Sequence, residues 1–302
     1  MARIESLNML NTEGAKVYLA EAYGKVIENV QKNTISAKIK NKDLSGDPTT
    51  GTVIASRLAN TTSNAYGTAR SGGKGQEVKK DEVIIAIDTD RELINDVEEK
   101  DARLGGVDNL ITRKSAMDEK SMTRELERAF FGCASTEGNT ATLTKTAIEE
   151  KVEELIQLIE GTKNDFVDGV ERDMINIVCS PAVYGELRIY LDKSANANVN
   201  TGVGECGTFH GVDVYSSVYL ADGDDMVGIV DGAIAQPVTT DLDEADKYPA
   251  SNCYHFGMFY SYGTKAVAPD LIQVVKGVPT STEEGADNGA DNGADNGEEA
   301  QG

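Results

Sequence analysis

The chain has 302 residues, of which 39% are hydrophobic, and this is enough to build the core of one large domain or of two smaller ones. Its 51 acidic and 29 basic residues give a formal net charge of −22, which argues against a protein that grips nucleic acid by its phosphates. Two histidines, no tryptophan and four cysteines without a C-x-x-C pair leave little material for histidine catalysis or a zinc site, so we expect no catalytic residue, no cofactor and no metal.

The N-terminal residues MARIESLNMLNTEG lack the apolar segment of a signal peptide, and no later run approaches the ~18 apolar residues of a membrane span. We therefore expect synthesis in a cytoplasm and no membrane partner. Residues 12–31 carry apolar residues at spacings of three and four, which predicts an amphipathic helix. Its stripe consists of Ala15, Leu19, Ala22, Val26, Ile27 and Val30. Because the stripe is narrow, two alternatives remain open: the helix docks on its own core, or it docks on a neighbouring subunit.

Residues 43–80 are rich in Thr, Ser, Gly and Asn and contain few large apolar residues, so this segment cannot form a core of its own. We expect its two halves, TVIASRLANTT and YGTARSGGKGQEVKK, to pair as two polar strands around a turn. Arms of about 14 residues would reach about 45 Å from the body. A two-stranded ribbon of this length is marginal alone in water, which indicates that it lies on another subunit.

The charge of this ribbon differs in sign from that of the remaining chain. Between residues 57 and 80, five basic residues against Glu77 give +4, so the rest of the chain carries −26. The basic residues are Arg57, Arg70, Lys74, Lys79 and Lys80. We expect them to contact an acidic neighbouring subunit, where complementary charge sets partner and register. The alternative is a solvated loop of mixed charge.

The next segments alternate between strand and helix patterns. VIIAI at 83–87 predicts a short buried strand, and residues 93–100 predict a brief extended or helical connector. Residues 107–131 have the spacing of a long amphipathic helix, with Asp118 as the point at which a break would fall.

The clearest helix lies between Thr144 and Gly161, with Thr146 as its predicted cap, Glu149 completing a capping box and Gly161 as its stop. Its buried stripe is Ile148, Val152, Leu155, Ile156 and Ile159. MINIVC at 174–179 predicts a central strand, and Ser180-Pro181 starts another helix. Residues 226–230 and 233–238 add strands to a small central sheet. The order helix, strand, helix indicates an α/β or α+β domain.

Gly202, Gly204 and Gly207 have the spacing of a dinucleotide-binding fingerprint. That fingerprint requires a strand before the glycines and a helix after them, so that the pyrophosphate meets a helix N-terminus. Here polar SANANVN precedes and TFHGVDVYSS, a strand pattern, follows. The pattern favours a mobile glycine-rich loop, and a cytosolic nucleotide-dependent enzyme remains as an alternative.

Two acidic clusters and the C-terminal tail are predicted to be solvated. The clusters are Asp222, Asp224 and Asp225, and Asp241, Asp243, Glu244 and Asp246. Neither has the residue spacing of a calcium-binding loop, so both are interpreted as surface loops. The tail after Pro279 repeats Gly-Ala-Asp-Asn three times and carries seven acidic residues and no basic one, which predicts disorder.

Residues 254–275 are the longest run that is dense in aromatic and β-branched residues. Phe256, Met258, Tyr260 and Tyr262 alternate with smaller or polar residues, which places them on one face of a strand. Residues 263–264 permit a turn, and a second apolar run ends at residue 275. We expect a pair of core strands joined by this turn.

The stretch FYSYGTKAVAPDLIQVV resembles the last strands of tailed-phage major capsid proteins. A second similarity to that family covers a helix that starts Ser-Pro, a polar loop, and a glycine-rich strand region. Its residues are Ser180, Pro181, Tyr184, Leu187, Gly204, Gly207, Gly211, Val214 and Ser217. Gly207 departs from the pattern, because it stands where a hydrophobic residue is expected. The two similarities recur in collinear order within residues 83–276.

The resemblance implies an α+β fold of the Hong Kong 97 type, with an N-terminal arm, an extended β-hairpin loop, a peripheral domain built on a long spine helix, and an axial domain whose central sheet is flanked by helices. A disordered acidic tail follows. The expected ranges are 1–45 for the arm, 46–82 for the loop, 83–140 and 247–279 for the peripheral domain, 141–246 for the axial domain and 280–302 for the tail.

The resemblance further implies a structural protein, not an enzyme, which self-assembles into the hexamers and pentamers of an icosahedral head shell. The shell would enclose double-stranded DNA without sequence-specific binding. Expected partners are other copies of the chain, a separate scaffolding protein, a portal and a decoration protein, and the expected location is the virion, after synthesis in the cytoplasm of a bacterial host. An encapsulin-like bacterial compartment, which packages enzymes in place of a genome, is the alternative with the same fold.

Overall fold

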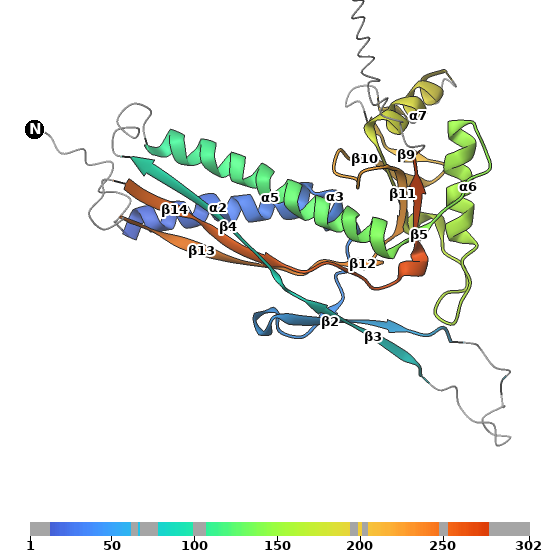
Figure 1. Ribbon diagram of the computed structural model, residues 1–302, viewed down its shortest axis with the longest axis horizontal. Helices are drawn as coiled ribbons and strands as arrows, with labels where there is room; N and C mark the ends of the chain where they lie inside the picture. Colours follow the sequence, from blue (N-terminus) through green and yellow to red (C-terminus); the bar gives the residue numbers. More distant parts are fainter. Residues whose placement is uncertain are drawn as a thin grey trace, which may run out of the picture.

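Two long helices and a three-stranded sheet form an elongated layer that joins a six-stranded sheet at one end, and a β-hairpin lies below the junction (Figure 1). This architecture comes from a computed structural model, which describes residues 13–61, 66, 78–98, 107–193, 199–200, 205–247 and 253–277. Among these residues, no helix is both long enough and apolar enough to cross a membrane. The mixture of helices and sheets confirms the α+β class.

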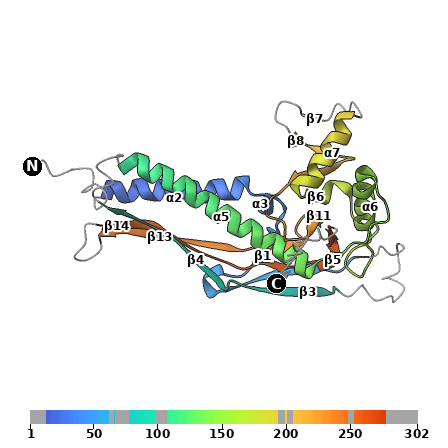
Figure 2. The same ribbon diagram turned by 45° about the horizontal axis from the view of Figure 1, so that its top comes forward.

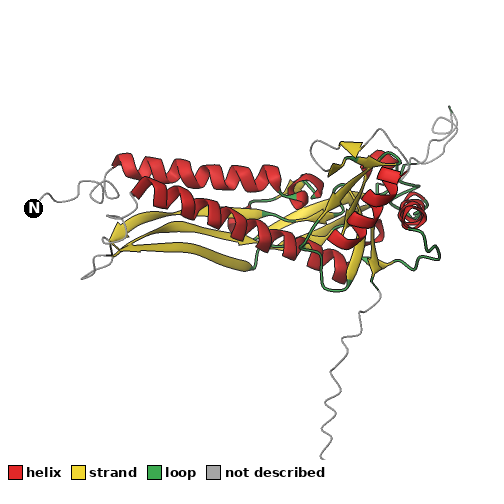
Figure 3. Ribbon diagram, turned by 90° about the horizontal axis from the view of Figure 1, so that it is seen from above, coloured by secondary structure: helices red, strands yellow, loops and turns green. Residues whose placement is uncertain are grey.

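The elongated layer places α2 (Glu13–Asn33) and α5 (Val107–Glu137) alongside the strands β4 (Thr89–Glu98), β13 (Val238–Lys247) and β14 (Cys253–Tyr262) (Figure 3). The strand order is β13-β14-β4, and both pairings are antiparallel. The aromatic run of the sequence is therefore the central strand of this sheet.

The core of the layer lies between β14 and the two helices. Phe256, Met258, Tyr260 and Tyr262 are all buried on one face of β14, as their alternation predicts, whereas Phe259 points outward. They pack against Tyr23, Val26, Val30, Ile111, Met122 and Leu126. The N-terminal helix therefore docks on its own chain, which decides between the two alternatives that its narrow stripe left open.

Two predictions for this layer need correction. Residues 93–98 are extended, which is one of the two predicted alternatives, but they belong to the ten-residue strand β4 and form no connector, because all of β4 pairs with β14. The helix α5 runs without a break past Asp118. That residue is buried, and its carboxylate accepts hydrogen bonds from the Tyr23 hydroxyl (3.0 Å) and the Asn95 amide (2.7 Å), so it has side-chain partners and does not compete for the helix backbone.

The six-stranded sheet has the order β5-β16-β11-β6-β10-β9, with parallel pairing of β6 to β10 and of β5 to β16. Its strands are β5 (Asn139–Thr140), β6 (Ile175–Cys179), β9 (Thr208–Phe209), β10 (Val212–Ser216), β11 (Asp224–Val230) and β16 (Ile272–Lys276). The helices α6 (Ile148–Glu160) and α7 (Pro181–Lys193) lie beside it and contact each other (Figure 2). All five residues of β6 are buried, which confirms the predicted central strand.

The helix α6 buries Val152, Leu155, Ile156 and Ile159 as predicted, and the backbone N–H of Gly161 closes its last turn. Its predicted cap is wrong. Ala147 occupies the N-cap position and makes no side-chain hydrogen bond there. The Glu154 carboxylate instead accepts the backbone N–H groups of Thr144 (2.9 Å) and Lys145 (3.1 Å), so the acceptor for this turn comes from within the helix.

The predicted pairing of the two C-terminal apolar runs is also wrong. β14 and β16 belong to different sheets, because both edges of β14 already pair, with β13 and with β4. After residue 263 the chain passes through β15 (Lys265–Ala266) and the 3-10 helix η4 (Pro269–Leu271) and enters the six-stranded sheet. β15 pairs with β12 (Ile234–Ala235), which is therefore not part of the central sheet either.

Asp222 lies in an exposed turn as predicted, but the other acidic residues of the two clusters lie in strands and not in loops. Asp224 begins β11 and is buried beside the ammonium group of Lys276, and residues 241–246 belong to β13. The expected domain ranges stay predictions. The boundary at 82/83 falls inside β3 (Lys80–Ala86), the boundary at 246/247 falls inside β13, and β16 lies in the six-stranded sheet although its sequence follows the peripheral strands.

The remaining elements are short. They are α3 (Ile35–Ile39), β1 (Leu44–Ser45), β2 (Thr52–Leu58), β7 (Val199–Asn200), β8 (Glu205–Cys206) and the 3-10 helices η2 (Pro48–Thr50) and η3 (Arg172–Met174).

Candidate interaction surface

The hairpin of β2 and β3 is the two-stranded ribbon that the polar segment predicts (Figure 1). The strands are antiparallel, with Thr52 opposite Ala86 and Leu58 opposite Lys80. The partner of β2 is KDEVIIA, not the predicted YGTARSGGKGQEVKK, most of which lies outside the described residues. The VIIAI strand is not fully buried as predicted, because only Ile85 among its residues is buried.

The inner face of the hairpin packs on the body of the protein. Ala55 and Ile85 form a small buried cluster with Ala235 and Val267, which come from β12 and the turn after β15. The backbone adds a hydrogen bond from the N–H of Asn60, just after β2, to the Asp165 carbonyl at 3.1 Å. The base of the hairpin is therefore part of the folded subunit.

The outer face of the hairpin exposes large apolar side chains. Leu58 is 61% exposed on β2 and Ile84 is 58% exposed on β3, and both point away from the buried cluster. Val78, just before β3, is 81% exposed. In the register of the hairpin the polar pair Ser56 and Glu82 lies between Leu58 and Ile84, so the exposed apolar side chains are spaced along the outer face.

An ion pair links Arg57, on the inner face of the hairpin, to Asp270 in η4, just before β16 of the six-stranded sheet. Its guanidinium donates two hydrogen bonds of 2.7 Å to the two carboxylate oxygens of Asp270, a fork-to-fork geometry, and lies 4.8 Å from the centre of the Phe166 ring. Burial alone would raise the pKa of Asp270, but the hydrogen bonds from Arg57 and Asn164 outweigh it and hold the pKa below its ordinary value. The pair is an intrachain joint.

The five basic residues predicted to contact a neighbour therefore differ in situation. Arg57 has an intrachain partner, whereas Lys79 and Lys80 are exposed on the hairpin, and Lys80 pairs with Glu82. Arg70 and Lys74 lie outside the described residues. The predicted inter-subunit role of all five stays a prediction.

An acidic surface covers the outward face of the three-stranded sheet, and we call it the acidic sheet face. Its carboxylates are Asp90, Glu92, Asp96 and Asp241, all exposed, with Ile94 and Phe259 between them. No Lys or Arg occupies an outward position of β4, of β14 from 255 to 261, or of β13 from 239 to 241. Sequence reasoning missed this surface because it did not recognise β4 as a strand.

The glycine-rich loop does not have the surroundings of a nucleotide site. Gly207 is exposed and is followed by β9 and β10, so the helix that a dinucleotide fingerprint requires does not follow it. Gly202 and Gly204 lie outside the described residues. Within the described ranges, no group of three or more His, Cys, Asp or Glu side chains is arranged to hold a metal ion.

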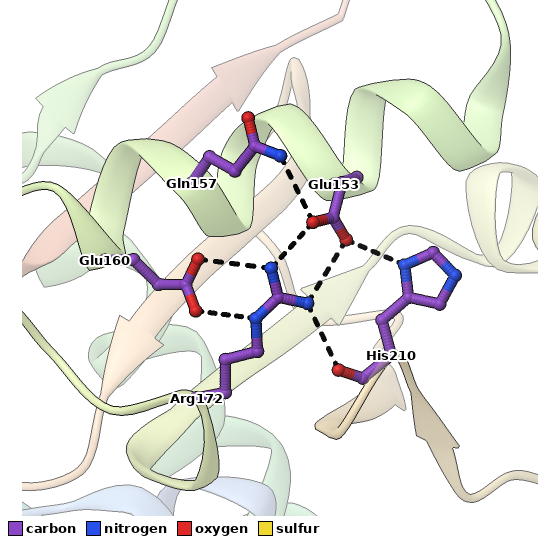
Figure 4. A network of polar contacts seen from close by, with 5 residues as sticks. All are labelled: Glu153, Gln157, Glu160, Arg172 and His210. Carbon is purple, nitrogen blue, oxygen red and sulfur yellow. Dashed lines mark hydrogen bonds and ion pairs between the residues drawn. The ribbon is translucent and has the colours of Figure 1, made fainter.

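A network around Arg172 fixes the face of α6 to the rest of its sheet (Figure 4). The guanidinium donates to Glu153 (2.7 Å) and Glu160 (2.6 Å), and His210 Nδ1 lies 2.7 Å from the Glu153 carboxylate. The hydrogen bond from Arg172 lowers the pKa of Glu153 to about 2, against a smaller opposing effect of burial. The sequence analysis did not predict this network, although Glu153 and Glu160 are seven residues apart and therefore lie on one side of the helix.

Comparison with known proteins finds solved structures with a similar fold, but no relative at the level of sequence. No protein-family model matches the sequence, and no curated protein matches it. A solved structure from Mycobacterium phage Che8 superimposes with a TM-score of 0.56 and 16% identity, covering 80% of this chain and 91% of that one. The capsid structure of cyanophage P-SCSP1u gives a TM-score of 0.56 and 11% identity, with 81% and 88% covered.

A virus-like particle from Pyrococcus furiosus is also similar, with a TM-score of 0.54 and 12% identity, over 86% of this chain and 99% of that chain. These likenesses span most of both chains in each comparison. They show that this chain has the α+β fold of the Hong Kong 97 type, which it shares with subunits of phage capsids and of a virus-like particle.

Proposed function

We propose that the protein is the major capsid protein of a tailed phage, which self-assembles into the hexamers and pentamers of an icosahedral head around double-stranded DNA. The observation that carries this proposal is the β2–β3 hairpin, whose inner face is built into the subunit while its outer face exposes the large apolar side chains of Leu58 and Ile84. The shared fold supports the same proposal. The role is structural, and the site of action is the virion.

The outer face of the hairpin favours contact with another copy of the chain. Covering the exposed parts of Leu58 and Ile84 would contribute about 1 to 2 kcal/mol each to an interface. A hairpin of two strands has little stability of its own beyond its packed base. Both effects favour a state in which the hairpin lies across a neighbour.

The acidic sheet face is the surface on the neighbour that best complements the hairpin. It combines four carboxylates with the half-exposed Phe259 and Ile94, whereas the hairpin combines apolar side chains with Lys79 and Lys80. Apolar contacts would supply affinity, and the opposite charges would set register and exclude wrong partners.

Charge reversal tests the proposal. The variant Arg70→Glu, Lys74→Glu, Lys79→Glu, Lys80→Glu leaves the intrachain joint of Arg57 intact, and we expect it to fold but not to assemble. Reversal of Asp90, Glu92, Asp96 and Asp241 to Lys in the same chain should restore assembly. A control that reverses Lys25, Lys32, Lys42 and Lys163, which are also exposed, changes the net charge equally and should still assemble. Particles from the hairpin variant that match the wild type would refute an electrostatic contact.

A separate scaffolding protein, a portal and a decoration protein are the partners that this proposal implies. Co-expression of the chain with candidate neighbours from its own genome, followed by electron microscopy of the particles, would identify them. Uniform closed shells formed by the chain alone would remove the need for a scaffolding protein.

A compartment shell that packages proteins in place of a genome is the second candidate function. The observation that favours it is the virus-like particle from Pyrococcus furiosus, because the likeness covers 99% of that chain. Nuclease treatment of purified particles, followed by extraction, separates the two functions. Protected double-stranded DNA of uniform length indicates a phage head, and protected enzyme without DNA indicates a compartment.

A further inference from the structure

The exposed side of α5 carries a row of cations. Arg113, Lys120, Arg124 and Arg128 follow one another at spacings of seven, four and four residues, which places them on one side of the helix. All four are exposed, whereas Ile111, Met122 and Leu126 on the opposite side of the helix are buried against the sheet. We call these four residues the helix row.

The cations of the helix row form no ion pair within 4 Å among the described residues, although Arg124 lies near enough to Glu125 to help lower the pKa of that carboxyl. Nearby, Arg91 pairs with Glu125 and Lys32 pairs with Glu28. Two carboxylates of α5 itself, Asp118 and Glu127, are buried and turned inward. A chain of charge −22 has many carboxylates to offer, so four adjacent unpaired cations are a specific feature of this surface.

The chemistry of the row fits phosphate groups. The helix rises by about 22 Å over the fifteen steps from Arg113 to Arg128. Three of the four cations are arginines, whose planar guanidinium matches the oxygens of a phosphate. The neighbouring exposed side chains are small or polar apart from Met117, and no aromatic residue lies in the row. Protein interfaces are enriched in aromatic anchors, whereas interfaces with DNA are polar and basic.

The acidity of the whole chain does not prevent such a contact. The acidic sheet face lies on the opposite side of the layer, with α5 itself between it and the row. A helix with its side chains is about 10 Å thick, while the Debye length is about 8 Å at physiological ionic strength. Salt therefore screens much of the repulsion from the sheet side, and the row acts at short range.

We infer that the helix row binds the phosphate backbone of double-stranded DNA, without sequence specificity, and that the α5 side of the layer faces the interior of the shell. The assignment of interior and exterior rests on the proposed function, whereas the binding of DNA does not. Contacts of four cations per subunit are weak singly, but many subunits presented on one surface make them effective together.

The test measures binding of unassembled full-length protein to a fluorescent DNA duplex over a series of salt concentrations. Each phosphate contact contributes about −0.9 to the slope of log K against log salt, so the wild type should give a slope of about −3 to −4. The variant Arg113→Gln, Lys120→Gln, Arg124→Gln, Arg128→Gln should lose most of this slope and bind at least about tenfold more weakly at low salt. Gln retains the helix propensity of Lys and Arg, so the fold should persist, which circular dichroism checks.

A matched control removes four exposed lysines outside the hairpin and the helix row, through Lys42→Gln, Lys145→Gln, Lys163→Gln and Lys193→Gln, and should keep the slope of the wild type. Equal DNA binding by the helix-row variant and the wild type would overturn the inference, as would a wild type that shows no salt-dependent binding. Polyglutamate that competes as well as DNA of equal charge would also overturn it, because the occupant would then be an acidic protein. Assembly of the wild type is scored separately, so a wild type that binds DNA with the expected slope but forms no particles would count only against the proposed function.

Discussion

Asp118 is a buried carboxylate that joins α5 to α2 and β4 through Tyr23 and Asn95. Burial raises the pKa of Asp118, and the two hydrogen bonds offset this only in part. Since its pKa is higher in the folded state than in the unfolded state, the folded state binds the proton more tightly, and stability falls as pH rises through the folded-state pKa.

The substitution Asp118→Asn tests this joint. It keeps an oxygen acceptor for both donors and removes the buried charge, so we expect the variant to be at least as stable as the wild type at pH 7. The advantage should shrink as pH falls through the raised pKa. Asp118→Ala removes the acceptor that the two donors share and should cost about 1 to 3 kcal/mol. Urea unfolding at pH 7 and pH 5 measures both, and an Asn variant that is no more stable than the Ala variant would contradict this account.

Glu153 has the opposite pH behaviour. Arg172 lowers the pKa of Glu153 to about 2 from an ordinary value of 4.5, so its contribution is fully present above about pH 4.5 and is lost as pH falls toward 2. We expect Glu153→Gln to be destabilised by about 1 to 2 kcal/mol at pH 6 and to approach the wild type near pH 2. The control Glu149→Gln, on the same helix, should show a much smaller difference. A difference in the free energy of unfolding between wild type and Glu153→Gln that stays constant over this pH range would contradict the prediction.

At the scale of elements, Gly257 and Gly24 differ in the space that an added methyl group would find. A Cβ on Gly257 would lie 2.0 Å from the Leu93 carbonyl oxygen, so β14 and β4 approach closely only because this residue is glycine. We expect Gly257→Ala to force the two strands apart and to lower the free energy of unfolding by more than about 2 kcal/mol, because the added methyl group overpacks the sheet.

Gly24, inside α2, has nothing within 4 Å of its added Cβ, and Gly24→Ala should raise the free energy of unfolding by about 0.5 to 1 kcal/mol. Thermal unfolding measures both variants, with a lower Tm expected for Gly257→Ala and a higher Tm for Gly24→Ala. Equal changes in Tm for the two variants would contradict this prediction.

The ion pair of Arg57 and Asp270 helps to hold the hairpin on the body, together with the apolar cluster around Ile85. Arg57→Gln removes the fork to Asp270 and leaves a half-buried carboxylate with fewer partners, which should cost about 1 to 3 kcal/mol and speed hydrogen exchange in β2 and β3. Lys80→Gln, on the same hairpin but exposed, should change stability by less than about 0.5 kcal/mol. Unaltered exchange rates in the Arg57 variant would mean that the apolar cluster alone fixes the hairpin.

Local periodicity explains which elements the sequence predicts. The helices α2 and α6, the strand β6 and the buried face of β14 all follow from the spacing of apolar residues within one segment. β4 was not recognised because its outward positions are acidic and its inward positions include Asn95, so its alternation is weak. Which strands pair is a property of the whole chain, and this is why the second C-terminal run was assigned to the wrong partner.

The candidate interaction surface also contains features that the sequence shows and features that only the structure shows. The basic residues of the hairpin are visible in the sequence as a local excess of charge. The partner of Arg57 lies 213 residues away, and the acidic sheet face takes its carboxylates from two distant strands. The helix row could have been found from its spacing alone, but the absence of paired carboxylates is evident only in three dimensions.

At the scale of the whole molecule, the elongated layer has two faces of opposite charge and a hairpin that projects beside them. On the function proposed above, each subunit would use the hairpin to contact a neighbour, the acidic sheet face to receive a neighbour's hairpin, and the helix row to bind DNA.

Sedimentation velocity of the purified full-length chain at high concentration tests self-assembly most directly. The account predicts a discrete, very large species for the wild type and only capsomers or monomer for the hairpin charge-reversal variant, with the large species recovered when the acidic sheet face is reversed as well. A wild type that sediments as a single monomer at every concentration, with crowding agent and with its genomic neighbours co-expressed, would contradict it.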